Sequence, residues 1–156
     1  DWLLLENKII DQQSSILCST KTSIDEFIAN PSLRFAMVQA SDAYILSSQP
    51  INLFANICSM QEMSIESIEK YFDIIKSSTA SKPYFYCCNR QTKVLPDSSV
   101  IEFSSYPWGN NYISIFYERC PWYSHYYSPV RFKFLPLPKF NIPFDGPIDH
   151  RLVQFN

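Results

Sequence analysis

Glycine is nearly absent from this chain, since only two glycines occur among 156 residues, where average usage is about 7%. Glycine supplies backbone with positive φ and lets the main chain approach a ligand closely. Phosphate-binding loops need several glycines, and so does the tight turn that presents the nucleophile of a hydrolase. The sequence contains none of these motifs, which argues against a nucleotide-dependent enzyme or an α/β-hydrolase.

Length and polarity predict one folded domain over residues 1–156. Apolar residues make up 46% of the chain and charged residues 18%, a balance that excludes an intrinsically disordered protein. No apolar run approaches the roughly 20 residues that cross a bilayer, so we expect no membrane partner.

Aromatic residues and positive charge are concentrated in the same half of the chain. Of 25 Phe, Tyr and Trp, 18 lie between Tyr84 and Phe155. Residues 1–78 carry five Lys/Arg and ten Asp/Glu, a net charge of −5, whereas residues 79–156 carry eight and five, a net charge of +3. Large rings beside cationic groups form binding surfaces for bases or peptides, or fill a core.

Five cysteines cannot all pair within one chain. Secreted domains of this size usually have an even set, so we expect reduced thiols in an intracellular protein, cytoplasmic or nuclear. Cys87 and Cys88 are consecutive in a predicted strand and therefore point to opposite faces. Because the cysteine and histidine spacing matches no zinc signature, the sequence predicts no metal site and no cofactor.

The first half of the chain alternates short helices and strands. Trp2, Leu5 and Ile9 share a helical face, and Ser23 with Glu26 matches a capping box that begins a short helix ending at Asn30. In the last strand of this half, Ile51, Leu53, Ala55 and Ile57 point one way, and Asn52 and Asn56 point the other. The predicted helix covers 2–12, and the predicted strands are 15–19, 33–39, 44–47 and 51–57.

The most strongly patterned helix is Ser64–Lys76, with Ser64 as N-cap and an apolar stripe of Ile65, Ile68, Phe72 and Ile75. The chain after Tyr84 has the pattern of strands and turns. We expect 84–88 and 92–95 to form a hairpin, and 151–155 to form a last edge strand. Proline excludes 135–149 from a central strand and makes it an extended arm. The remaining predicted strands are 100–104, 112–118 and 130–135.

These elements together predict an α+β fold. We expect a largely antiparallel sheet with one well-packed central helix and short N-terminal helices. A barrel-like sheet is one option, because of the order in which the elements follow one another. From Leu33 to Ser104 the succession of three strands, a helix and two strands resembles that of an oligonucleotide/oligosaccharide-binding barrel, in element order alone.

Nothing in the sequence predicts catalysis. Cys120, His125 and His150 are the residue types of a nucleophile and its base, but such chemistry also needs an orienting group and donors for the oxyanion. We therefore expect no catalytic residues and a non-catalytic protein.

The sequence predicts a protein–protein interaction domain of an intracellular assembly, which binds a partner segment through an aromatic-rich C-terminal surface. The alternative is a domain that binds single-stranded nucleic acid by base stacking on an OB-like barrel. The pI of about 5.6 favours the protein partner, because nucleic-acid-binding domains are usually basic. The predicted binding residues are Trp108, Arg119, Trp122, Tyr123, Tyr126, Tyr127 and Arg131.

Overall fold

The computed structural model describes residues 14–122, 127–130, 140–143 and 146–156. The chain divides into two compact units, residues 1–49 and 50–156. The predicted helix over residues 2–12 lies outside the described residues.

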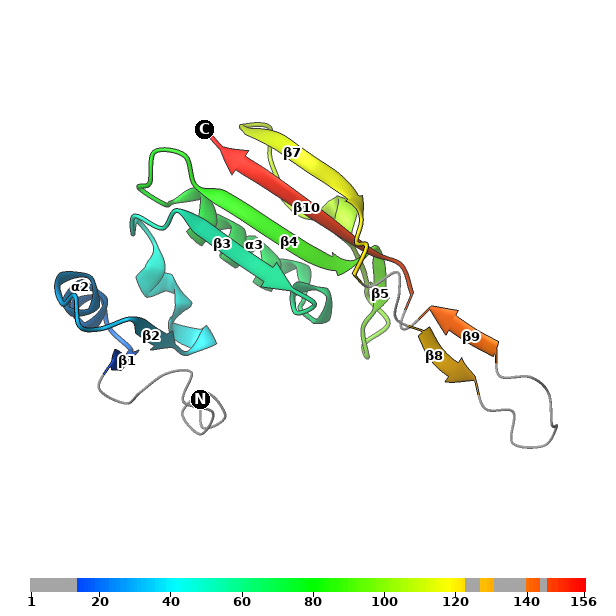
Figure 1. The fold of residues 1–156 in the computed structure, drawn as a ribbon, viewed down its shortest axis with the longest axis horizontal. Coiled ribbons are helices and arrows are strands. Elements are labelled where there is room, and N and C mark those ends of the chain that lie inside the picture. The colour runs from blue at the N-terminus through cyan, green and yellow to red at the C-terminus, as the bar shows by residue number, and fades with distance from the viewer. Residues whose placement is uncertain (1–13, 123–126, 131–139, 144–145) are drawn as a thin grey trace. The chain divides into compact units, whose positions relative to one another are not determined.

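The first unit contains a β-α-β motif (Figure 1). Strand β1 (Ser15–Cys18) pairs in parallel with β2 (Phe35–Val38), and helix α2 (Lys21–Ala29) connects them. Cys18 at the end of β1 and Ile24 of α2 are buried against Ile45. A small apolar core of its own therefore holds this motif together.

The N-cap of helix α2 lies three residues before the predicted one, Ser23. Thr20 is the N-cap, because its side chain accepts a hydrogen bond from the backbone N–H of Ser23, and the Ser23 side chain accepts one from the backbone N–H of Thr20. Ser23 thus fills the place that Glu usually takes in a capping box. The helix stops at its C-cap Asn30, ahead of Pro31, as predicted.

The strand predicted at 44–47 is wrong. This segment lies in the 3₁₀ helix η2 (Ala40–Leu46), which turns Ile45 into the core of the first unit. A short apolar run such as Tyr44-Ile45-Leu46 suits a strand or one helical turn equally well, so periodicity alone did not distinguish them.

The second unit is built on one mixed four-stranded sheet in the order β3-β4-β10-β7. Strands β3 (Leu53–Ile57) and β4 (Tyr84–Arg90) are parallel, whereas β10 (Ile148–Phe155) runs antiparallel to both β4 and β7 (Tyr112–Arg119). The fold is broadly α+β. The strands of the described residues form no closed barrel, so the barrel-like arrangement expected from element order is not found.

Helix α3 (Ile65–Lys76) connects β3 to β4 and covers one face of the sheet, behind it in Figure 1. Ser64 is its N-cap, as predicted, and accepts a hydrogen bond from the N–H of Ser67. Ile68, Phe72 and Ile75 of α3 pack in the main core with Phe85 of β4. None of the helices in the described part of the chain is long and apolar enough to span a membrane.

Aromatic rings fill this core. The ring of Phe72 contacts those of Phe85 and Trp108 edge to face, with centroid distances of 5.4 and 5.1 Å. Phe103, in the 3₁₀ helix η4 (Phe103–Ser105), and Tyr106 complete the cluster. Five of the 18 aromatic residues between Tyr84 and Phe155 are therefore buried in the core: Phe85, Phe103, Tyr106, Trp108 and Phe155.

A network of buried amides ties the segment after β3 to β4. Asn89 is fully buried; its Oδ1 accepts from the N–H of Gln61 (3.2 Å), and its Nδ2 donates to Oδ1 of Asn56 (2.9 Å) and Sγ of Cys87 (3.1 Å). Gln61, in the 3₁₀ helix η3 (Met60–Glu62), in turn accepts from the N–H of Arg90 (2.7 Å). Every hydrogen-bonding atom of the Asn89 amide thus has a partner.

The predicted hairpin between 84–88 and 92–95 is wrong. Strand β5 (Thr92–Val94) pairs with β6 (Val100–Glu102) in a separate two-stranded sheet. Strand β4 instead has β3 and β10 on its two sides, which leaves no edge for β5. At residues 89–91 the chain therefore passes from the four-stranded sheet to the two-stranded one, and it does not turn back to pair with β4.

The strand predicted at 151–155 is found as part of β10, but its predicted place at an edge is wrong, because β10 lies inside the sheet between β4 and β7. Seven residues of the predicted arm over 135–149 lie outside the described residues. Its described parts are β9 (Phe140–Pro143), which pairs with β8 (Tyr127–Val130), residues 146–147 and the first residues of β10.

Candidate functional site

The face of the sheet turned away from α3 is lined mainly by apolar residues. This face of the sheet is turned toward the viewer in Figure 1. Strand register arranges these residues in three rows that cross all four strands. We call the residues of these rows the open face. The rows are Leu53, Tyr84, Gln154 and Ile113; Ala55, Tyr86, Leu152 and Phe116; and Ile57, Cys88, His150 and Glu118.

Several large apolar side chains of the open face are exposed to solvent. Leu53 is 61% exposed, Ile57 55% and Ile113 53%. Leu53, Ala55 and Ile57 share a face, as the alternation predicts, but in β3 it is Phe54, from the opposite row, that packs against the core. The most regular apolar alternation in the sequence therefore points away from α3.

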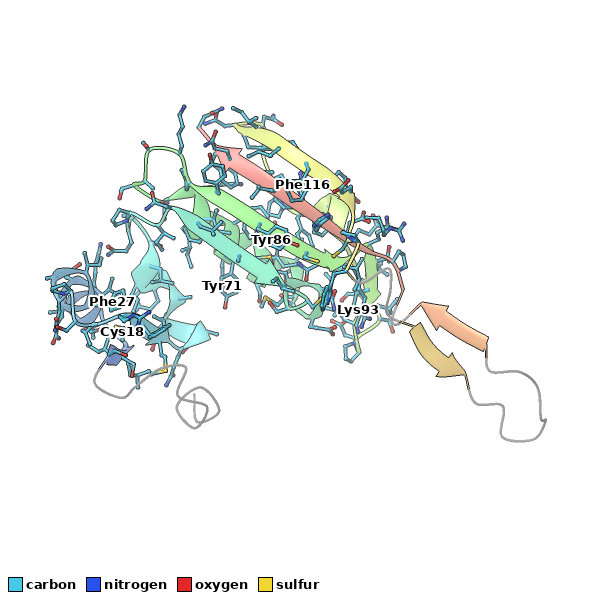
Figure 2. All side chains as sticks on the ribbon, in the orientation of Figure 1. Cys18, Phe27, Tyr71, Tyr86, Lys93 and Phe116 are labelled. Atoms are coloured by element: carbon cyan, nitrogen blue, oxygen red, sulfur yellow. The ribbon has the colours of Figure 1, made fainter. Side chains whose placement is uncertain are left out.

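A tyrosine, a histidine and a glutamate meet near one end of the open face. The hydroxyl of Tyr86 lies 3.2 Å from Nδ1 of His150, and Nε2 of His150 lies 3.4 Å from Oε1 of Glu118. The second contact is close enough for an ion pair but is not aligned as a hydrogen bond. The ring of Phe116, 4.8 Å from the imidazole centroid, borders the group; Tyr86 and Phe116 are labelled in Figure 2.

Tyr86 stays protonated in this environment. Burial, followed by the neighbouring thiols of Cys88 and Cys120, raises the pKa of Tyr86 above its usual value of 10.0. Its hydroxyl therefore keeps a proton, which it can donate to Nδ1 of His150 when that nitrogen is the acceptor. The arrangement orients polar groups within an apolar face.

Three cysteines gather beside this group. Cys88 and Cys120 are buried with Ile148, and the N–H of Cys58 donates to the carbonyl of Cys88 over 2.8 Å. Burial, together with a hydrogen bond to Cys120, raises the pKa of the Cys88 thiol. A thiol with a raised pKa is a poor nucleophile at neutral pH.

Cys87 and Cys88 point to opposite faces of β4, as predicted. Cys87 lies in the main core on the α3 side, and Cys88 lies in the smaller cluster on the other side. None of the five cysteines, all of which lie in the described part of the chain, is joined in a disulfide. The described residues contain no group of three His, Cys, Asp or Glu side chains arranged to hold a metal ion.

On the α3 side of the sheet, Arg151 is enclosed by aromatic rings. Its guanidinium carbon lies 4.6 Å from the ring centroid of Trp108, 4.8 Å from that of Tyr112 and 5.3 Å from that of Tyr117. The guanidinium also donates to the hydroxyl of Tyr112. These cation–π contacts fix Arg151 within the core-facing layer rather than present it to a ligand.

Two of the predicted binding residues take structural positions. Trp108 is only 5% exposed, packs in the main core and donates its Nε1–H to the carbonyl of Phe103 (3.4 Å). The Nε of Arg119 lies 3.3 Å from Oδ1 of the buried Asp149, which also accepts from the side chain of Gln91. Trp108 therefore does not belong to an exposed surface. The side chain of Arg119 pairs with Asp149 but is itself 54% exposed, so its part in binding stays a prediction.

The other predicted binding residues follow β7. Trp122 is 67% exposed. Tyr127 begins β8, and only its backbone is described. Tyr123, Tyr126 and Arg131 lie outside the described residues. The role of these residues in binding stays a prediction.

The open face was not among the predicted sites. Its residues come from four strands, and its rows exist only through the register of β4 with β10 and of β10 with β7. One signal was present in the sequence: the alternation of Leu53, Ala55 and Ile57. Alternation groups side chains on a face but does not say which face is covered.

No family model, curated protein or solved structure matches this chain.

Proposed function

We propose that the second unit is a non-catalytic protein-interaction module that binds a partner protein through the open face. The observation that supports this is the half or greater exposure of Leu53, Ile57 and Ile113 on one continuous sheet face. Contiguous apolar surface rimmed by polar groups is typical of a protein-binding site.

The parallel pair in the sheet strengthens the argument. Parallel strands are usually covered on both faces, because the helices of their crossovers lie on those faces. Here α3 covers one face of β3 and β4, and the described residues of this unit leave apolar side chains of the other face exposed. A partner that covers the open face would complete the usual environment of such a pair.

A protein suits the open face better than a single-stranded nucleic acid. The three rows include Tyr84, Tyr86 and Phe116, which are rings able to stack on bases, but they contain no lysine or arginine. Proteins that bind single-stranded nucleic acid place lysine or arginine side chains along its phosphate backbone. The exposed carboxylate of Glu118 would repel a phosphate.

The proposed class of function is the one predicted from the sequence, but the proposed contact surface is the open face. Tyr84, Tyr86 and Phe116 of the open face belong to the aromatic-rich half of the chain. The proposed setting remains an intracellular assembly, and Trp122 remains a candidate for the rim of the contact.

A photocrosslinking experiment tests the proposal. A benzophenone amino acid is placed at Ile113 on the open face, or at Val94 on β5, which is 61% exposed and lies off the face. In extract from the native source we expect a discrete crosslinked protein from position 113 and none from position 94. Leu53→Lys should abolish the crosslink, because it puts a charge into the contact.

The variant Val94→Lys is the matched control, since it adds the same charge at the same exposure away from the open face. It should leave the crosslink from position 113 unchanged. Equal crosslinking from positions 113 and 94, or a crosslink that survives Leu53→Lys, would contradict the proposal.

A further inference from the structure

The open face has the dimensions of one helix. Its outer strands, β3 and β7, are separated by three strand spacings of about 4.8 Å, or about 14 Å. Along β3 the rows run from Leu53 to Ile57, about 13 Å at roughly 3.3 Å per residue. An α-helix is about 10 Å across with its side chains and advances about 1.5 Å per residue, so two to three turns span this patch.

The charge of the open face is one-sided. Glu118 is its only acidic residue, is 67% exposed, and stands at the end of the row that contains His150. No lysine or arginine in the three rows balances it. A partner with a cationic side chain at this place gains an ion pair, whereas an anionic one is repelled.

A partner strand that pairs with the edge of β7 is a less suitable way to bind this sheet than a helix on the open face. The register of β7 with β10 shifts between Leu152 and Val153, where Ile115 is the extra residue of a bulge. Bulges twist an edge strand and interrupt its ladder, which is one way that proteins protect an edge from pairing. A second copy laid face to face is also disfavoured, because it would bring the Glu118 carboxylates of both copies into the contact.

We infer that the partner presents an amphipathic α-helix of two to three turns, whose apolar stripe covers the open face and whose lysine or arginine pairs with Glu118. This inference rests on the proposed function. It assigns the helix-in-groove mode of recognition and completes a three-layer arrangement, with α3 on one face of the sheet and the partner helix on the other.

Two synthetic peptides of identical composition test the inference. Each contains leucine, alanine, glutamine and lysine; one has leucine at helical spacing, and the other alternates leucine strictly with polar residues. Fluorescence anisotropy with the full chain should show at least about tenfold tighter binding of the helical-pattern peptide. Leu53→Lys should abolish that binding, and Val94→Lys should not.

An exchange of charge at position 118 tests whether the cationic residue of the partner helix lies beside Glu118. Glu118→Lys should weaken binding of the lysine peptide by about threefold, the scale of an exposed ion pair. It should strengthen binding of a peptide with glutamate in place of that lysine by a similar factor.

Equal or tighter binding of the alternating peptide would overturn the inference in favour of strand addition. A lack of binding by either peptide up to about 1 mM would also overturn it. Neither result would affect the crosslink from position 113, so failure of the helical partner is distinguishable from failure of the proposed function.

Discussion

Asn89 is predicted to be the polar residue of the second unit that tolerates truncation least. In Asn89→Ala the buried N–H of Gln61 loses the acceptor that now lies 3.2 Å away. An unsatisfied buried donor costs about 1–3 kcal/mol, and the missing carboxamide adds a cavity. Asn56 loses less, because its Oδ1 still accepts from the N–H of Met60. We expect Asn89→Ala to lower the free energy of unfolding by about 2–4 kcal/mol.

Urea unfolding followed by tryptophan fluorescence, to which the buried Trp108 contributes, measures this loss. Asn52→Ala is the matched control, because Asn52 is exposed at the start of β3 and its truncation should change the free energy by no more than about 0.5 kcal/mol. Equal unfolding midpoints for the two variants would show that the amide network carries no stability.

Asn89→Asp separates hydrogen bonding from shape. It keeps an acceptor for Gln61 but puts a carboxylate oxygen where Nδ2 now donates to Oδ1 of Asn56 over 2.9 Å. Burial should raise the pKa of the new carboxyl in the folded state above its unfolded value of about 3.9. The folded state then binds the proton more tightly, so the variant should lose stability as pH rises above about 4. A stability difference from wild type that is the same at pH 4 and pH 7 would refute this reasoning.

Two further predictions concern the core. Phe72→Ala should lower the free energy of unfolding by about 3–5 kcal/mol, because the ring is fully buried against Phe85 and Trp108; an unchanged urea midpoint would show that the α3 stripe is not core. Burial raises the pKa of Cys87 to about 12, so its folded thiol keeps a proton that the unfolded thiol loses above about pH 8.5. Stability should therefore fall by up to about 1.4 kcal/mol per pH unit from this thiol as pH rises from about 8.5 toward 12, and Cys87→Ala should show a shallower fall in urea titrations at pH 8 and 10.

Local signals predicted the elements that local interactions determine. Ser64 and the stripe of Ile68, Phe72 and Ile75 lie within 12 residues of one another, so the start of α3 and its core-facing side can be predicted from this segment alone. Asn30 before Pro31 likewise ends α2 through a restriction between neighbours.

Pairing between distant segments was not predictable in the same way. His150 of β10 pairs with Cys88 of β4, more than 60 residues earlier in the chain, and nothing in the 151–155 pattern indicates that both of its edges are occupied. The side chain of Trp108 suits a core as well as a surface, and only the packing of α3 against β4 decides between them. The open face is the least predictable part of the molecule from sequence, because every one of its rows depends on such pairings.

The position of β10 constrains the order in which the second unit can fold. The last strand of the chain fills the centre of the sheet, so β4 and β7 have no ladder between them until Ile148–Phe155 is available. During synthesis both would present unpaired edges rich in apolar and aromatic residues, which favours association with other chains. The sheet is also dominated by contacts between distant residues, which slows folding. Loss of this single strand would separate β7 from β3 and β4, so the whole open face exists only once the final strand has inserted.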